Sequence, residues 1–204
     1  MKVLGFVGSP RKGGNSDILA DTFLEGAAAA GAATKKFFLA DHTINQCRGC
    51  FRNCTTIPGI ACAVFRDAMD MLLAEMAAAD LMLFASPLYC ATYSSIMARF
   101  FERCLPFWEI EITGELGTMD AFRFINNPVK GKKAVTALVQ DLKEPKVGEL
   151  AFTAYEHNVG RTYMMNIIDT IHITDVRDVG DIKKKTEKLE EIFSLGKKLA
   201  SPIA

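Results

Sequence analysis

The sequence lacks several features that would assign it to a familiar class of protein. Its 204 residues carry 24 basic and 24 acidic side chains, so no excess of one sign predicts binding to nucleic acid or a membrane surface. No apolar stretch is long enough to cross a bilayer. The short apolar run at the N-terminus meets a Gly/Pro/Arg loop, unlike a signal peptide. The sequence therefore predicts a cytoplasmic protein with no nucleic-acid or membrane partner.

Residue sets that carry hydrolytic or metal chemistry are also scarce. The histidines, His42, His157 and His172, do not have metal-ligand spacing. There is no defensible Ser-His-Asp order and no obvious carboxylate pair, which is expected where a cofactor carries the chemistry. Repeats, linkers and low-complexity segments are absent too. We expect a single domain spanning residues 1–204.

Five short apolar segments alternate with helical patterns along the chain. A continuous apolar run that ends at a Gly/Pro turn is typical of a strand buried on both faces. The strands are expected at residues 2–8, 34–39, 81–85, 134–139 and 170–174, and the helices at residues 15–27, 64–78, 94–104, 149–165 and 181–200. This alternation predicts an α/β fold: a flavodoxin-like, doubly wound, five-stranded parallel sheet in the order 2-1-3-4-5. Residues 40–62 and 105–131 are expected to form a cysteine-bearing loop and an extended loop.

The loop after the first predicted strand, GSPRKGGNS, has the composition of an anion site. It precedes a helix N-terminus, where free N–H groups and the helix dipole favour negative charge. Arg11 adds a planar charged fork suited to phosphate oxygens. The other candidates are donors and a glycine that permits close approach: Ser9, Gly14, Asn15 and Ser16. The spacing fits neither the Walker A pattern nor the dinucleotide fingerprint, and the alternative is an ordinary turn with a capping serine.

Two motifs together resemble the NADPH-dependent FMN reductase family. The first, G-S-P-R-x-x-G-N-S after an N-terminal strand, looks like the phosphate loop of that family. The second resembles its flavin-contacting loop and helix, and comprises Ser86, Pro87, Leu88 and Tyr89 followed by Ser94, Met97, Phe100 and Arg103. The resemblance implies a flavodoxin-like fold, FMN as cofactor and a homodimer or homotetramer. The family often has a lysine where Ala98 stands, which puts any role of that lysine in doubt here.

The second motif also has a physical reason to contact a flavin. The ring is flat and apolar with polar edges, so it needs backbone N–H groups at its rim and apolar or aromatic side chains on its faces. Pro87, Leu88, Tyr89 and Thr92 supply these where the loop leaves the sheet. The alternative is a proline-ended strand whose tyrosine packs on the next helix.

Four of the six cysteines lie within sixteen residues: Cys47, Cys50, Cys54 and Cys62. Four thiolates can hold a [4Fe–4S] cluster or a zinc ion, and this loop follows the second strand, on the side of the sheet expected to hold the flavin. The window resembles the compact motif of the iron-sulfur flavoproteins, a branch of the same family, with a middle gap one residue longer. A zinc site, a redox-active C-x-x-C pair and free thiols are the alternatives. Cys90 and Cys104 are expected to be core residues.

These observations favour an FMN-dependent oxidoreductase that moves electrons between a reduced donor, NAD(P)H or ferredoxin, and an acceptor. A flavodoxin-like electron carrier without its own substrate is the alternative, and a scaffold without cofactor is a third. Residues 105–131 are long for a helix–strand connection and rich in large apolar side chains. Since soluble monomers seldom expose such patches, we expect this segment, together with the helix at residues 94–104, to form a dimer whose partner covers the flavin. A lid folded over its own sheet is the alternative.

Overall fold

The structure, a computed structural model, describes residues 1–56, 59, 61–115, 118 and 121–201. The parts of the predicted loops at residues 57–58, 60, 116–117 and 119–120 lie outside the described residues. The strands are β1 (Lys2–Val7), β2 (Ala33–Phe38), β3 (Leu81–Tyr89), β4 (Thr92–Tyr93), β5 (Glu109–Ile112), β6 (Phe122–Asn126), β7 (Lys133–Val139) and β8 (Asn166–Ile173). The α-helices are α1 (Asn15–Ala29), α2 (Phe51–Thr55), α3 (Ala68–Ala77), α4 (Ser95–Glu102), α5 (Glu149–Tyr155) and α6 (Thr186–Ala200).

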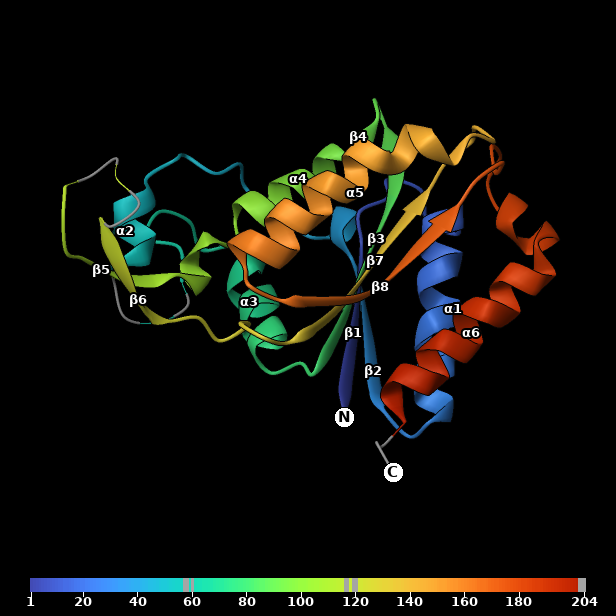
Figure 1. The fold of residues 1–204 in the computed structure, drawn as a ribbon, viewed down its shortest axis with the longest axis horizontal. Coiled ribbons are helices and arrows are strands. Elements are labelled where there is room, and N and C mark those ends of the chain that lie inside the picture. The colour runs from blue at the N-terminus through green and yellow to red at the C-terminus, as the bar shows by residue number, and fades with distance from the viewer. Residues whose placement is uncertain (57–58, 60, 116–117, 119–120, 202–204) are drawn as a thin grey trace.

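The central sheet has the strand order β2-β1-β3-β7-β8, and all four of these pairings are parallel (Figure 1). This confirms the predicted α/β fold and the order 2-1-3-4-5. Phe6 of β1 lies opposite Phe37 of β2 and Phe84 of β3, and its ring stacks on both at 5.3 and 5.5 Å. Aromatic pairs across neighbouring strands stabilise a sheet, so this row helps to fix the register at its centre.

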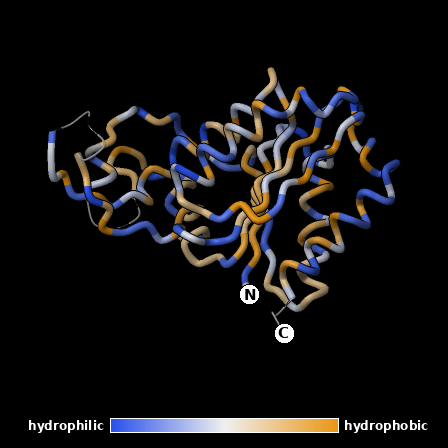
Figure 2. Tube along the Cα trace, in the orientation of Figure 1, coloured by the Kyte–Doolittle hydropathy of each residue, from blue (hydrophilic) through white to orange (hydrophobic). Residues whose placement is uncertain are grey.

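Helices cover both faces of the sheet, as the apolar runs predicted. One core lies between the sheet and α1 with α6, and the other between the sheet and α3, α4 and α5. Figure 2 shows the apolar segments concentrated along the central strands and polar segments on the outer turns of the helices. None of the helices in the described ranges has both the length and the apolar character needed to cross a membrane.

Several boundaries differ from the predicted ones for identifiable reasons. The helix predicted at 64–78 begins at Ala68 because the Asp67 side chain accepts the Met69 N–H and caps it. The last strand begins at Asn166, earlier than expected. Its first residues are mostly exposed because β8 is an edge strand, so they form no continuous apolar run that the sequence could reveal. The helix predicted at 149–165 divides into α5 and a π-helical segment, Glu156–Thr162.

The extended loop predicted at 105–131 contains an antiparallel hairpin, β5–β6, that packs against α2, the helical part of the cysteine loop. We call α2 and this hairpin the hairpin lobe; it projects from the left of the sheet in Figure 1. Trp108 anchors it, because its indole N–H donates to the Thr162 carbonyl at 2.7 Å and its ring meets Phe51 and Phe124 edge-on. A pocket lies at the carboxyl ends of the central strands, and the described residues of the hairpin do not line it. The alternative that residues 105–131 form a lid over their own sheet therefore receives no support.

Candidate functional site

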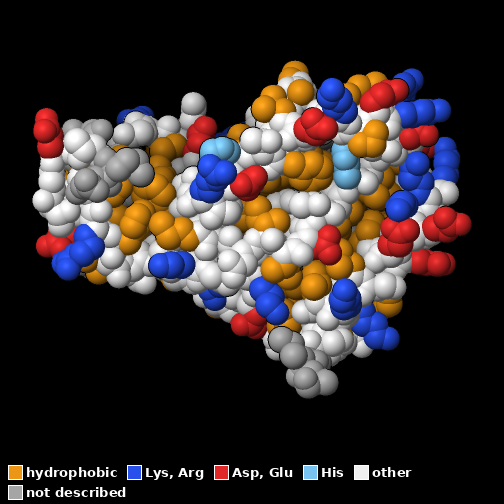
Figure 3. All heavy atoms as spheres, in the orientation of Figure 1, with side chains coloured by type: hydrophobic (Ala, Val, Ile, Leu, Met, Phe, Trp, Pro, Cys, Tyr) orange, Lys and Arg blue, Asp and Glu red, His pale blue; other side chains and the backbone are white. Residues whose placement is uncertain are grey.

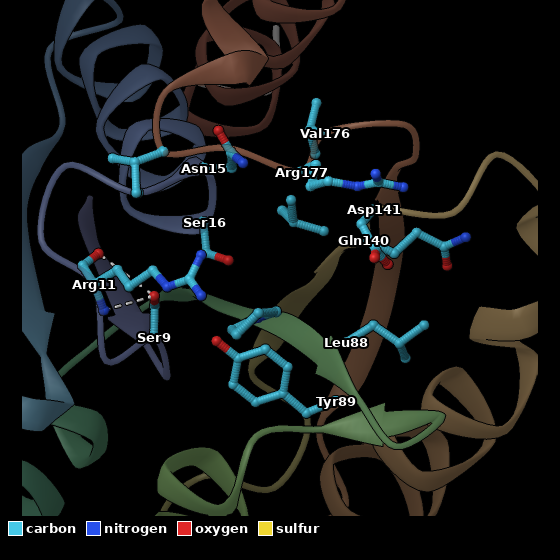
Figure 4. Close-up of a pocket in the computed structure, with 14 residues that line it drawn as sticks. Ser9, Arg11, Asn15, Ser16, Leu88, Tyr89, Gln140, Asp141, Val176 and Arg177 are labelled. Atoms are coloured by element: carbon cyan, nitrogen blue, oxygen red, sulfur yellow. Dashed lines mark hydrogen bonds between the residues drawn. The ribbon is translucent and has the colours of Figure 1, made fainter.

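A pocket of about 270 Å³ lies at the carboxyl ends of the central strands. We call it the main pocket. In doubly wound folds ligands bind at this edge, where the strand order reverses. Its lining comprises Ser9, Arg11, Gly14, Asn15, Ser16, Pro87, Leu88, Tyr89, Val139, Gln140, Asp141, Val176, Arg177 and Val179. Figure 4 shows Ser9 and Arg11 on one side, Gln140, Asp141 and Arg177 on the other, and Tyr89 below. Eight of the nine predicted cofactor-binding residues therefore share one pocket.

The loop between β1 and α1 is preorganised by its own side chains. The buried Ser9 hydroxyl accepts the Arg11 backbone N–H at 3.1 Å, and the Asp17 carboxylate accepts the Gly13 N–H at 2.9 Å. The Arg11 guanidinium is exposed and makes no hydrogen bond or ion pair with the described residues. An unpaired guanidinium beside the N-terminus of a 15-residue helix favours an anion.

Asn15 lines the main pocket, but its side chain is engaged in holding two loops together. Its amide donates to the Asp178 carbonyl at 2.9 Å, and its carbonyl accepts the Ile182 N–H at 3.1 Å. Helix α1 begins after Gly14 without a side-chain cap, so Asn15 does not cap it. Asn15 instead fixes the loop after β8, which carries Arg177, against the loop after β1.

The second wall is formed where β3 leaves the sheet. Ser94 caps α4 by accepting the Met97 N–H at 3.2 Å, and its hydroxyl donates to the Gly8 carbonyl. This contact requires a glycine, because a Cβ at position 8 would lie 2.8 Å from the Met97 Cβ. The hydroxyl of Ser86 in turn accepts the Ser94 N–H at 2.9 Å. The two predicted motifs are thus joined directly, which places Pro87–Tyr89 beside the anion loop.

The third wall escaped the sequence analysis, and Gln140 is its centre. Its backbone N–H donates to Ile173 at 2.8 Å, and its side-chain amide donates to the carbonyls of Leu142 and Glu144, both at 2.9 Å. Since that amide nitrogen donates twice, the Oε1 atom must accept from His172 Nε2, 2.9 Å away. Burial lowers the pKa of His172, which favours its neutral form. The available signal was position, because Gln140 directly follows a buried strand.

The four clustered cysteines line a second, small cavity of about 20 Å³, which we call the cysteine cavity. Cys47 and Cys50 are half-buried, and Cys54 and Cys62 are buried. Burial, together with the neighbouring cysteines, raises the pKa of Cys54 to about 11. Within the described ranges no three His, Cys, Asp or Glu side chains have the arrangement of a bound metal ion. The four thiols nevertheless face one shared space.

Backbone N–H groups point at two of these sulfurs. Cys62 Sγ accepts from Val64 at 3.5 Å and from Phe65 at 3.4 Å, and Cys47 Sγ accepts from Gly49 at 3.5 Å. Hydrogen bonds to sulfur are one of the means by which proteins tune iron–sulfur clusters. Four thiols with N–H donors directed at two of them have the donor chemistry of a thiolate-held cluster, although the sulfurs are not arranged as around a bound ion in the described residues.

Helix α4 connects the two sites. Its N-cap, Ser94, touches the anion loop, while Glu102 at its end and the following Arg103 line the cysteine cavity. Eight residues of α-helix rise roughly 12 Å. The main pocket and the cysteine cavity therefore lie at opposite ends of one short helix.

Comparison with known proteins identifies the family. The profile of the NADPH-dependent FMN reductase family matches residues 1–143, well over half of the chain. The chain belongs to the NADPH-dependent FMN reductase family. As a member it is a flavoprotein oxidoreductase with FMN as its cofactor, and the predicted family is confirmed.

Relatives of this FMN reductase family member include two iron-sulfur flavoproteins. The one from Methanocaldococcus jannaschii is 30% identical over 210 residues, covering 100% of this chain and 97% of the relative. The one from Archaeoglobus fulgidus is 35% identical over 107 residues. That match covers 52% of this chain and only 47% of the relative's length. A solved flavone reductase has a TM-score of 0.69 at 18% identity, covering 98% of this chain and 62% of that one. At that identity the likeness shows the fold alone.

Two residues of the reductase motif region lie elsewhere than expected. Thr92 does not line the main pocket in the described part of the chain, because the chain reverses after Tyr89 and pairs Thr92 beside it in β4. Cys90 is exposed at this turn, so its assignment to the core is wrong. Cys104 is fully buried, as predicted, and burial raises its pKa.

The turn between β3 and β4 is strained, which leads to a prediction about stability. Cys90 and Ala91 have φ values of 49° and 61°, a region that costs an L-residue roughly 1–2 kcal/mol and in which two-residue hairpins favour glycine. Replacing Ala91 with glycine should therefore raise the free energy of unfolding by about 1 kcal/mol. Urea unfolding, with the m-value unchanged, measures this change in the free energy of unfolding. Ala33→Gly, within β2 at ordinary φ, is the control and should destabilise; a loss of stability in Ala91→Gly would contradict the strain.

Proposed function

We propose that this family member takes electrons from NAD(P)H or a reduced ferredoxin and passes them to an acceptor, using FMN in the main pocket and a [4Fe–4S] cluster in the cysteine cavity. The observation that carries the proposal is that the main pocket has a cationic end for a phosphate next to an apolar and aromatic wall for a flavin ring. One end offers the unpaired Arg11 and the start of α1, and the adjoining wall offers Pro87–Tyr89. When bound, FMN supplies one- and two-electron chemistry and the cluster one-electron chemistry.

In this proposal the residues of the chain bind FMN and orient its ring. Arg11, the Ser16 hydroxyl and the free N–H groups of the first turn of α1 bind the FMN phosphate. Tyr89 and its neighbours pack on the ring, and the Gln140–Asp141 segment closes the far side. Asn15 acts indirectly, since it holds the loop of Arg177 against the phosphate loop.

The cysteine cavity is the proposed site of the cluster. Cys47, Cys50, Cys54 and Cys62 would hold the cluster through their sulfurs, with the N–H groups of Gly49, Val64 and Phe65 directed at two of them. Support comes from the shared cavity and from the two iron-sulfur flavoprotein relatives.

Steady-state turnover tests the proposed activity. Purified, FMN-loaded protein should oxidise NADPH or NADH in many-fold excess over its flavin when a quinone acceptor is supplied, and reduced ferredoxin is the second donor to test. Chemical reduction by dithionite, followed by reoxidation on acceptor addition, is the positive control. Flavin that dithionite reduces but that neither nicotinamide nor ferredoxin turns over would overturn the reductase and favour an electron carrier.

We also propose that the hairpin lobe forms the interface of a homodimer or homotetramer in which a partner copy covers the flavin. Phe124 and Ile125 of β6 are 39% and 52% exposed. Figure 3 shows orange hydrophobic side chains at the surface of this lobe. Aromatic and aliphatic side chains are enriched at interface cores, and exposed apolar patches on soluble proteins mark interaction surfaces. Trp108 is unsuitable as a probe because it packs within the chain.

The substitution Ile125→Ser should convert the protein to a smaller species and weaken FMN retention, because it removes an exposed apolar side chain from the proposed interface. Light scattering gives the mass, and flavin fluorescence gives the retention. Leu150→Ser is the matched control, because Leu150 is 62% exposed on α5, outside the lobe. A wild-type protein that is monomeric at tens of micromolar would overturn the interface.

A further inference from the structure

A buried ion pair lies immediately behind the cysteine cavity. Arg103 donates to Asp67 through both terminal nitrogens, at 2.8 and 3.1 Å. The side chains of Arg103 and Asp67 are only 2% and 3% exposed. A buried pair of this kind is costly to desolvate, and replacing one partner alone leaves an uncompensated charge.

The pair fastens both ends of the cysteine loop to the end of α4. Before Cys47, the Asn45 carbonyl accepts from Arg103 at 2.8 Å, and the Asn45 backbone and side-chain N–H groups donate to Asp67 at 3.0 and 2.9 Å. After Cys62, the Phe65 ring packs under the Arg103 guanidinium, 5.1 Å from its centroid. The segments that flank the first and last cysteines of the set therefore both contact the Arg103–Asp67 pair.

The pair is also oriented with respect to the sulfurs. Arg103 lines the cysteine cavity together with the four cysteines, whereas Asp67 does not. The thiols consequently face the positive end of a buried dipole. Arg48 and Glu102, which also line the cavity, add one exposed charge of each sign, so the buried contribution comes from Arg103.

We infer that Arg103 is a positioning residue of the cysteine site, which sets the spacing of the cysteine loop and raises the reduction potential of the cluster held there. The inference rests on the proposed cluster. Reduction adds negative charge to a thiolate-held cluster, and a fixed cation nearby stabilises the reduced state, since local charge and sulfur hydrogen bonds tune such potentials. Removing the cation should shift the potential to more negative values.

Four variants of the reconstituted full chain test this. Arg103→Gln should lower the midpoint potential of the cluster in an anaerobic titration followed by electron paramagnetic resonance, and Arg103→Lys, which keeps the charge, should restore most of it. The double variant Asp67→Asn with Arg103→Gln removes the pair without stranding a carboxylate, and it should also show the lowered potential. Arg99→Gln is the matched control: Arg99 bonds the Ile44 carbonyl of the same loop at 3.3 Å but does not line the cysteine cavity, so its potential should match the wild type.

Iron content and FMN binding separate the outcomes. Loss of iron from Arg103→Gln with FMN binding intact, and its recovery in Arg103→Lys, would support the positioning role. Iron retained at the wild-type potential in Arg103→Gln and in the double variant would overturn this inference alone. Loss of FMN together with iron in every Arg103 variant would reduce the pair to a general folding role and also overturn it. Wild-type protein that takes up no iron would instead overturn the proposed cluster.

Discussion

Replacing Cys50 with alanine should remove the iron from anaerobically reconstituted protein and leave FMN in place. The wild type should carry about four irons per chain, as four thiolates hold a [4Fe–4S] cluster. Cys50 is half-buried and lines the cavity with the other three thiols, so its loss leaves an incomplete ligand set. FMN should stay because Cys50 does not line the main pocket. Iron and sulfide analysis with the visible spectrum measures both cofactors.

The control for this experiment is Cys90→Ala. Cys90 is exposed at the turn between β3 and β4 and does not line the cysteine cavity, so its removal should not change the iron content. Wild-type protein that holds flavin but no iron after reconstitution would contradict the cluster and identify the cysteines as free thiols. Stoichiometric zinc in place of iron would indicate a structural metal site.

The second large effect is expected at the phosphate loop. Replacing Arg11 and Ser16 together with alanine should weaken FMN binding at least about tenfold, because a hydrogen bond to a charged group contributes roughly 1.5–3 kcal/mol and about 1.4 kcal/mol is a factor of ten. Both side chains line the main pocket, and neither makes a side-chain hydrogen bond with the described residues that would be lost on substitution. Flavin fluorescence titration measures the affinity. Arg177→Ala, in the opposite wall, is the matched control and should reduce FMN binding less.

Much of the fold and part of the site could be predicted from the sequence. Strands buried on both faces produce continuous apolar runs, which is why β1, β3 and β7 were located to within a few residues and the sheet order followed. The anion loop and Pro87–Tyr89 could be found because each is a local motif at a strand end. Their direct connection through Ser94 and Gly8 is tertiary, so no local pattern could reveal it.

The parts that escaped prediction depend on contacts between distant segments. Gln140 and Arg177 come from two further strand ends without a motif, and only the topology brings them to the main pocket. Asn15 was predicted to bind the phosphate because its side-chain amide is a donor in the anion loop, yet the partners of that side chain lie more than 160 positions away along the chain. The β5–β6 hairpin was missed because its packing against α2 is a tertiary contact.

The central claim is that the main pocket holds FMN by its phosphate, and a comparison of FMN with riboflavin tests it most directly. Riboflavin has the same ring without the phosphate, so apo-protein should bind FMN at least about tenfold more tightly. The Arg11→Ala, Ser16→Ala variant should lose most of that preference while binding riboflavin as the wild type does. Equal affinity of the wild type for both flavins, or a preference that survives the double substitution, would contradict the account.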